Sequence, residues 1–410
     1  LLLDQGYLIN AYPVLQFSGG KGAKIGLSYA EALYDGQMKK GNRNEVEGKR
    51  FIGRKDSLVS AGRKWEEFRP YSYRTYRYLK LTVETGAEAL VLEDLRSLFL
   101  GYPFQMEAEL SSDVPEMQDM LKVGWRTARL CAVDTYMDCP YYEQLQYIGD
   151  ARIQALVSLY NSGDDRLVKN ALNLMDQSRQ PEGVTLSRHP SYTPQYIPTF
   201  SLWYIGMLHD YLRYGRDTEF VREKLGGVHQ ILQYFNKYQK EGGSLRQVPQ
   251  WSFTDWVSDR DWAAGVGPKG KDGGSAMLDF QLLYGYQVAV QLERDLEVSV
   301  YTATYMERIA ELKKSIRERY WVAGRGLFAD RKEADVFSQH TNTLAILTGI
   351  LDEAEEQKVA DKLLVDSSLS QASIYFKYYL HRALVKAGRG NAYLNYLDNW
   401  RENLKMGLST

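Results

Sequence analysis

Hydrophobic and polar positions follow two different periods along the chain, and the period changes near residue 112. Before that point, apolar and aromatic residues occur in strand-length runs separated by glycine-bearing turns, as in YLINAYPVLQFSG (7–19), AKIGLSYAEAL (23–33) and YSYRTYRYLKLTVETG (71–86). Short strands that follow one another without an intervening helix are typical of an all-β sandwich. We therefore expect residues 1–108 to form a β-sandwich.

After residue 112 the spacing of apolar residues becomes three and four, the period of an α-helix. The first such segment opens with Ser112 and Asp113 as cap candidates and Pro115 in the first turn. The same period continues almost to the last residue, with two long interruptions at 179–198 and 240–274. The pattern predicts eleven helices, at 114–131, 147–161, 165–178, 199–213, 218–239, 275–293, 298–321, 339–350, 353–364, 373–387 and 391–406.

The number and variety of these helices favour one closed architecture. No sequence repeat of fixed length is present, which argues against a solenoid. About a dozen unlike antiparallel helices can instead close as two concentric rings, an (α/α)6 toroid with its site in the loops at one end. The predicted fold is thus mixed and mainly α: a β-sandwich followed by a toroid over 109–410, which we expect to lack its last helix.

Composition and charge limit the kinds of molecule that the protein is expected to bind. The chain has 410 residues, 44% hydrophobic and 25% charged, and a formal net charge of −1, which argues against a nucleic-acid partner. No apolar run reaches the roughly 18 residues that span a bilayer, so no membrane partner is expected. Cys131 and Cys139 have no Cys or His partners at ligand spacing. We expect two buried free thiols and no cofactor, and we assign no metal ligands; calcium binding, oligomeric state and compartment are left open.

The aromatic residues have an unusual distribution. Tyrosine (31) outnumbers phenylalanine (13), which suits half-wet surfaces such as sugar-binding clefts and interfaces. In the loop 240–274, Trp251, Trp256 and Trp262 are spaced five and six residues apart, which fits no helical stripe. Two interpretations remain open: the tryptophans pin the loop to the barrel, or they form an apolar wall beside acidic acceptors such as Asp255, as a deoxy-sugar requires.

The segment DCPYYEQLQYIGD (138–150) concentrates acids among tyrosines and aliphatic residues, which is typical of a cleft wall. Glycosidic cleavage usually needs one protonated and one ionised carboxyl group on opposite sides of the bond. Glu143 lies beside Tyr142 and Tyr147, and an apolar setting favours the protonated form that a general acid needs. Asp138 and Asp150 would stay ionised and hold sugar hydroxyls. The alternative is that Asp150 caps a helix and the other two acids are merely solvated.

The same segment resembles the signature of the α-L-rhamnosidases, glycoside hydrolase family 78. It matches the shorter form of that signature, D-C-P-x-Y-E-x-L-x-Y-x-G-D, at every fixed position. Four other segments are also similar to members of this family: 13–33 and 68–81 to its β-sandwich, and 194–211 and 337–349 to its barrel. The resemblance thus extends over nearly the whole chain.

This resemblance implies an inverting hydrolase that acts on terminal, non-reducing α-L-rhamnose in a glycoside or polysaccharide. By motif position Glu143 corresponds to the general acid, and Asp138 and Asp150 to carboxylates that contact the sugar. We expect Tyr147 and Trp256 to bind substrate as well, because the methyl group of rhamnose needs an apolar contact beside its hydroxyls, and Asp255 to bind it as a hydrogen-bond acceptor. The arginine of the longer signature is absent, and we expect the family's general base, a glutamate after the last barrel helices, beyond Thr410.

Other functions remain open at this point. An (α/α)6 glycosidase of another kind, such as a fucosidase, a trehalase-like enzyme or an unsaturated-glucuronyl hydrolase, also carries acids at the mouth of its barrel. A non-catalytic carbohydrate-binding protein would use its acids only to hydrogen-bond sugar. The sequence does not choose among a flavonoid glycoside, a pectic rhamnogalacturonan and a bacterial polysaccharide as substrate.

Overall fold

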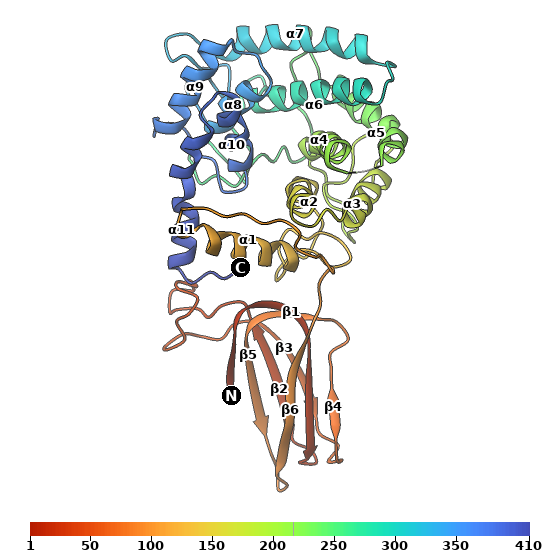
Figure 1. Ribbon diagram of the computed structural model, residues 1–410, viewed down its shortest axis with the longest axis vertical. Helices are drawn as coiled ribbons and strands as arrows, with labels where there is room; N and C mark the ends of the chain where they lie inside the picture. The colour runs from red at the N-terminus through yellow and green to blue at the C-terminus, as the bar shows by residue number, and fades with distance from the viewer. Residues whose placement is uncertain (216) are drawn as a thin grey trace. The chain divides into compact units, whose positions relative to one another are not determined.

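The computed structural model describes residues 1–215 and 217–410, and its chain divides into two compact units (Figure 1). The first unit comprises Leu1–Leu145, Tyr160–Ser162 and Asp398–Thr410. The second comprises Gln146–Leu159 and Gly163–Leu397. The predicted order, strands first and helices afterwards, is confirmed, with one exception: a short hairpin of β7 (Trp321–Val322) and β8 (Leu327–Phe328) lies between two of the later helices. The predicted domain boundary at residue 108 remains a prediction.

The first unit is built on an antiparallel sheet. Its strands pair in the order β3-β2-β5-β1-β4, with β6 paired to β1 as well. Period-two alternation explains the core: Ile25, Leu27 and Tyr29 of β2 all point to the buried face, where the ring of Tyr29 lies 5.3 Å from that of Tyr76. The strands are β1 (Leu2–Gly19), β2 (Lys24–Ala30), β3 (Arg54–Val59), β4 (Glu66–Phe68), β5 (Arg74–Glu84) and β6 (Leu90–Phe99).

Two helices belong to the same unit as the sheet, α1 (Met117–Leu130) and α11 (Asp398–Lys405). The amide of Asn10 on β1 donates to the carbonyl of Leu130, the last residue of α1, at 2.8 Å in a buried position. Arg401 of α11 forms an ion pair with Glu116, next to the start of α1. Residues far apart in sequence therefore close this unit.

The second unit is helical, with one set of helices inside another. Helices α4, α6, α8 and α10 contact one another in succession, whereas α3, α5, α7 and α9 each pack on one or two of them; α6 and α7, for example, lie side by side (Figure 1). The helices are α2 (Ile148–Ser162), α3 (Arg166–Gln177), α4 (Pro198–Tyr214), α5 (Thr218–Asn236), α6 (Ala276–Asp295), α7 (Thr302–Tyr320), α8 (Gln339–Leu347), α9 (Glu353–Val365) and α10 (Lys377–Lys386).

The sequences of the two sets differ as their positions require. Helix α8 is buried along nearly its whole length, and α6 is similar, because a helix surrounded by others needs apolar or paired residues on every side. Helix α7 buries only one stripe, which includes Tyr305, Leu312 and Ile316. None of the helices in the described residues is both long enough and apolar enough to cross a membrane.

A buried arginine ties four helices of the second unit together, α2, α4, α6 and α10. Arg152 of α2 donates to the carboxylate of Asp210 on α4 at 2.8 Å and to the hydroxyl of Tyr284 on α6 at 2.6 Å. Its guanidinium also lies over the rings of Trp203 and Tyr379, which stack on each other at 4.7 Å. Removing one partner of a buried pair of this kind typically costs about 3–5 kcal/mol, because the other charge stays buried and unpaired.

All eleven predicted helices are present, and the differences lie at their ends: α5 stops at Asn236 rather than 239 and α8 at Leu347 rather than 350, and several helices start late. The helix predicted from 298 begins at Thr302, because the carboxylate of Glu293 accepts the backbone N–H of Tyr301 just before it. The helix predicted from 373 begins at Lys377, because the N–H of Ser373 donates to a distant carboxylate. The last one begins as a 3-10 turn, Gly390–Leu397, ahead of α11.

Candidate functional site

The loop 138–145 in the first unit is closed by its first and last residues. The backbone N–H of Asp138 donates to the carbonyl of Leu145 at 2.8 Å, and the N–H of Leu145 donates to Oδ1 of Asp138 at 2.9 Å. The carbonyl of Pro140 accepts from the hydroxyl of Thr75 on β5 at 2.7 Å and from the amide of Gln144 at 2.8 Å. The loop is thus fixed both to itself and to the sheet.

Tyrosines attach the same loop to the first unit and leave Glu143 exposed. The hydroxyl of Tyr141 is buried and donates to the carbonyl of Tyr29 at 3.1 Å, and the hydroxyl of Tyr142 lies 2.9 Å from that of Tyr34. The backbone N–H of Glu143 donates to Sγ of Cys139 at 3.3 Å, while the residue itself is exposed. The loop therefore presents a carboxyl group to solvent from a rigid base.

Both cysteines are free, as expected. Cys131 is buried, but Cys139 is only half-buried, because it lies in the loop rather than in the core. Burial raises the pKa of the Cys139 thiol, and hydrogen bonds from the backbone of Glu143 and Gln144 offset this only in part. Within the described residues, no group of three or more His, Cys, Asp or Glu side chains is arranged to hold a metal ion.

In the second unit, a row of aromatic rings connects two of the predicted site residues. Tyr147 precedes α2 directly, and its hydroxyl accepts from Arg188 at 2.6 Å. Its ring lies 6.4 Å from Phe200, which lies 5.8 Å from Phe253, which in turn lies 5.2 Å from Trp256. Tyr147 and Trp256 are therefore the two ends of one apolar row.

The three tryptophans of the long loop have different environments. Trp256 is 65% exposed, whereas Trp262 is buried with its ring 4.7 Å from His340. The indole N–H of Trp251 donates to the carbonyl of Ala264 within the loop at 2.9 Å. Trp251 and Trp262 thus pack the loop, whereas Trp256 presents its ring to solvent, and a part of Trp256 in sugar binding stays a prediction.

Asp255, the neighbour of Trp256, is completely buried and holds three donors. Its Oδ2 lies 2.7 Å from Nε2 of His340 and accepts the N–H of Ser373 at 2.9 Å, while its Oδ1 accepts the hydroxyl of Ser373. Burial alone would raise the pKa of this carboxyl, but the hydrogen bonds from His340 and Ser373 outweigh it and lower the pKa. Asp255 therefore anchors the loop to α8 and to the segment before α10.

Asp150 lies in the first turn of α2, close to Tyr375, whose hydroxyl is buried. A side chain in place of Gly149 would come within 2.9 Å of the hydroxyl of Tyr375 and 2.7 Å of Phe200, so glycine permits this close approach. Burial raises the pKa of Tyr375 well above its usual value, and the charges of Tyr379, Asp150 and Asp255 add to the shift. Tyr375 consequently keeps its proton and can donate a hydrogen bond.

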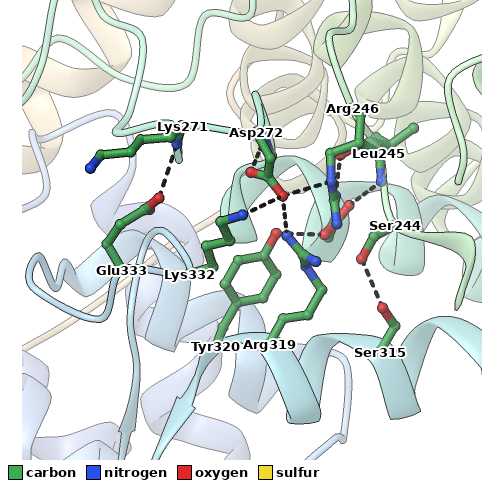
Figure 2. A network of polar contacts seen from close by, with 12 residues as sticks. Ser244, Leu245, Arg246, Lys271, Asp272, Ser315, Arg319, Tyr320, Lys332 and Glu333 are labelled. Atoms are coloured by element: carbon green, nitrogen blue, oxygen red, sulfur yellow. Dashed lines mark hydrogen bonds and ion pairs between the residues drawn. The ribbon is translucent and has the colours of Figure 1, made fainter. Parts of the chain in front are cut away.

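A second network fixes the far end of the long loop (Figure 2). Oδ2 of Asp272 pairs with Arg319 at 2.6 Å, Arg246 at 3.0 Å and Lys332 at 3.4 Å, and Oδ1 accepts the N–H of Gly274. Burial would raise the pKa of Asp272, but these donors and cations hold it well below its usual range. The loop that carries Trp256 is thus held by one carboxylate near its middle, Asp255, and by another near its end, Asp272.

Sequence reasoning identified some members of this site and not others. Within the second unit the structure brings Tyr147, Asp150, Asp255 and Trp256 into one neighbourhood, and the first unit holds Asp138 and Glu143 in one loop. The roles predicted for these six residues remain predictions. Sequence reasoning missed His340 and Ser373, which lie 85 and 118 residues from Asp255. It also missed Tyr375, which follows Ser373 by two residues.

Comparison with solved structures shows the same fold in several rhamnosidases. The chain aligns over its full length with the GH78 family rhamnosidase of Bacillus sp. GL1 (TM-score 0.87, 21% identity) and with a Klebsiella oxytoca rhamnosidase with rhamnose bound (0.82, 17%). It aligns over 95% of its length with the Streptomyces avermitilis α-L-rhamnosidase complexed with L-rhamnose (0.72, 17%). It spans 42%, 80% and 36% of those three proteins, respectively.

Curated protein sequences give no match to the chain. Two family models do match, however, and together they cover nearly all of it. Residues 1–100 match the concanavalin-like domain of bacterial α-L-rhamnosidases, and residues 105–395 match their six-hairpin glycosidase domain. The chain therefore belongs to the bacterial α-L-rhamnosidase family.

Proposed function

We propose that the protein is a glycoside hydrolase that releases terminal, non-reducing α-L-rhamnose with inversion at the anomeric carbon. The observation that carries this proposal is the complete family signature at 138–150, in a chain whose two domains both match the family. Of the functions that the sequence left open, another (α/α)6 glycosidase would not require this signature, and a purely binding protein would not require an acid at its centre.

Glu143 is proposed as the general acid. It is exposed on a loop that hydrogen bonds fix to the sheet, so its carboxyl group can reach a leaving oxygen without a rearrangement of the backbone. In an inverting glycosidase the acid protonates that oxygen while a base activates water on the opposite face, at a carboxyl separation of about 6.5–9.5 Å. A rigid loop raises the rate of such a step because it holds the acid in the right position before the reaction starts.

The remaining residues are proposed to bind the sugar. Asp138 and Asp150 would accept hydrogen bonds from its hydroxyls, and the apolar row from Tyr147 to Trp256 would contact its methyl group. For Asp255 we propose an indirect part: its carboxylate is buried and holds Ser373 and His340, and through its backbone it positions the exposed ring of Trp256. Tyr375 would add a hydroxyl donor beside Asp150.

The direct test is hydrolysis of 4-nitrophenyl α-L-rhamnoside by the full-length protein, with the first sugar product followed by proton NMR. Inversion predicts that β-L-rhamnose appears first and mutarotates to α. Initial release of the α anomer would contradict the inverting mechanism. Faster hydrolysis of 4-nitrophenyl α-L-fucoside would favour a fucosidase, and binding of rhamnose without hydrolysis of either glycoside would favour a carbohydrate-binding protein.

A further inference from the structure

The long loop 179–198 brings an arginine to the start of α2, entirely within the second unit. Arg188 forms an isolated antiparallel bridge with Tyr147, the residue that directly precedes the helix. Residues that lie opposite each other in an antiparallel pair point their side chains to the same face, with Cβ atoms about 4.5–5.5 Å apart. The backbone alone therefore places the side chain of Arg188 beside that of Tyr147.

Hydrogen bonds on both sides of this bridge hold it in place. The backbone N–H of Ile148 donates to the carbonyl of Ser187 at 3.0 Å, and the N–H of His189 donates to the carbonyl of Gln146 at 3.2 Å. The side-chain amide of Gln146, a buried residue, donates to the carbonyl of His189 at 2.9 Å. None of these bonds uses the side chain of Arg188, so a substitution of that side chain leaves them intact.

The guanidinium of Arg188 is directed at residues that are proposed to bind rhamnose. It donates to the hydroxyl of Tyr147 at 2.6 Å and lies 5.4 Å from the centre of that ring. Tyr147 begins the apolar row that ends at Trp256, and Asp150 follows Tyr147 by three residues, in the first turn of α2. A cation and a carboxylate therefore both lie at the Tyr147 end of the apolar row.

This combination of groups matches the chemistry of a sugar hydroxyl, which both donates and accepts hydrogen bonds. A carboxylate such as that of Asp150 only accepts, so a donor is needed for the hydroxyl oxygen. A guanidinium has five N–H donors on a rigid fork, and the bond from Arg188 to Tyr147 uses one of them. Arg188 is half-buried, so its side chain reaches solvent. Hydrogen bonds from a charged donor are roughly twice as strong as neutral ones.

We infer that Arg188 is a specificity-determining residue of the reaction, whose guanidinium donates to a ring hydroxyl of the terminal sugar. The inference rests on the proposed rhamnosidase function. It adds a residue that selects the sugar by a hydroxyl group, whereas the apolar row selects it by the methyl group. The bond to Tyr147 holds the guanidinium before the sugar arrives, so little side-chain entropy is lost on binding.

The test uses 4-nitrophenyl α-L-rhamnoside and the three analogues that each lack one ring hydroxyl, the 2-, 3- and 4-deoxy glycosides. Arg188→Met in the full-length protein removes the guanidinium and keeps an unbranched apolar stem. Its kcat/KM for the parent glycoside should fall about 10- to 100-fold, the loss of one hydrogen bond from a charged group. For at least one deoxy analogue the variant and the wild type should be nearly equal, because the hydroxyl that Arg188 binds is missing.

The pattern over the four substrates separates a sugar contact from a structural role. If Arg188 only supports Tyr147 or the loop, Arg188→Met lowers kcat/KM for all four glycosides by the same factor, and that result would overturn the inference. Unchanged hydrolysis of the parent glycoside by Arg188→Met would overturn it too. Both results would leave the rhamnosidase proposal intact, because the wild type still cleaves the rhamnoside.

Two further variants control for folding. Arg179→Met is the matched control, because Arg179 belongs to the same loop but donates to Gln230 on α5 at 2.7 Å. Its kcat/KM should equal that of the wild type for all four substrates. Arg188→Lys keeps the positive charge without the fork of donors, and it should lose less activity than Arg188→Met, with the same dependence on one hydroxyl. If Arg188→Met does not fold, an equal loss on all four substrates in Arg188→Lys would overturn the inference.

A binding measurement separates the two proposals if no glycoside is hydrolysed. Isothermal titration calorimetry with L-rhamnose needs no turnover. Binding that is weaker in Arg188→Met than in both the wild type and Arg179→Met would then support the contact although the hydrolase proposal had failed. Equal binding in the three proteins would overturn it.

Discussion

At the scale of single residues, the proposed role of Glu143 as general acid can be tested with substrates whose leaving groups differ in how much protonation they need. A dinitrophenolate leaving group needs little protonation, whereas a sugar alkoxide needs much. General acid catalysis typically raises the reaction rate by roughly 10²–10⁴-fold. Glu143→Gln should therefore lower kcat/KM for a rhamnosyl disaccharide far more than for 2,4-dinitrophenyl α-L-rhamnoside. The measurement is kcat/KM for both substrates in wild type and variant. An equal fall for the two would make Glu143 a sugar-binding residue rather than the acid.

The exposed ring of Trp256 offers a second residue-scale test. We expect Trp256→Ala to raise KM for rhamnosides about tenfold, because an aromatic contact buried on binding is worth one to a few kcal/mol. Trp65 on the first unit has nearly the same exposure, 61% against 65%, and Trp65→Ala serves as the control. A similar KM in the two variants would show that the ring of Trp256 only packs the loop.

At the scale of elements, the pairing of Arg152 with Asp210 determines how α2, α4 and α6 hold together. Arg152→Leu should destabilise the protein by about 3–5 kcal/mol, because it leaves the Asp210 carboxylate buried and unpaired. The double variant Arg152→Leu/Asp210→Leu should recover a large part of that loss. Chemical denaturation of the wild type, Arg152→Leu, Asp210→Leu and the double variant measures both effects. A double variant as unstable as the sum of the two single ones would show that the charges do not act as a pair.

Helices could be predicted from the sequence far better than the contacts between them. The positions of α2 to α10 followed from apolar spacing, which is local information. The late starts of α7 and α10 did not, because Glu293 and Asp255 take the backbone N–H groups of Tyr301 and Ser373. These are side-chain contacts, and the second of them joins residues 118 apart in sequence.

The same limit applied to the site. Asp255 and Trp256 were identified because acids and tryptophans cluster in one loop. The complete burial of Asp255 was not foreseeable, since it depends on His340, which lies 85 residues away and looks like any other histidine in a helical pattern. Motif position pointed to Glu143 and Asp150, whereas nothing in the sequence around Tyr375 marks its contact with Gly149.

At the scale of the whole molecule, two buried carboxyls predict how stability depends on pH. Burial raises the pKa of Asp330 to about 7 and that of Asp279 to about 6, from a usual value of 3.8, although hydrogen bonds from Thr341 and Ser338 and from Leu245 and Tyr320 partly oppose the shifts. In this window the folded protein holds protons that the unfolded chain has released. Stability is therefore greatest below about pH 4 as far as these groups are concerned, and it falls as the pH rises through about 6 to 7.

Asp330→Asn removes the larger of these two contributions, because an amide does not titrate. The wild type should lose more Tm between pH 5 and pH 8 than the variant does, by about 2–4 °C for each kcal/mol of difference. Differential scanning fluorimetry across this range measures the two slopes. Parallel slopes would mean that Asp330 does not change its protonation between the folded and unfolded states.

Two contacts fix the loop that carries Trp256: Asp255 accepts from Ser373, and Asp259 accepts from the hydroxyl of Ser370. They have a consequence for protein engineering. Between them lie only Trp256, Val257 and Ser258, and both ends of this span are held by Ser373 and Ser370 through groups that the three residues do not supply. Random substitution of the three positions should leave the backbone of the anchors in place. A small library of variants at these three positions can therefore be screened for hydrolysis of glycosides with other leaving groups, while the helices that support the loop stay unchanged.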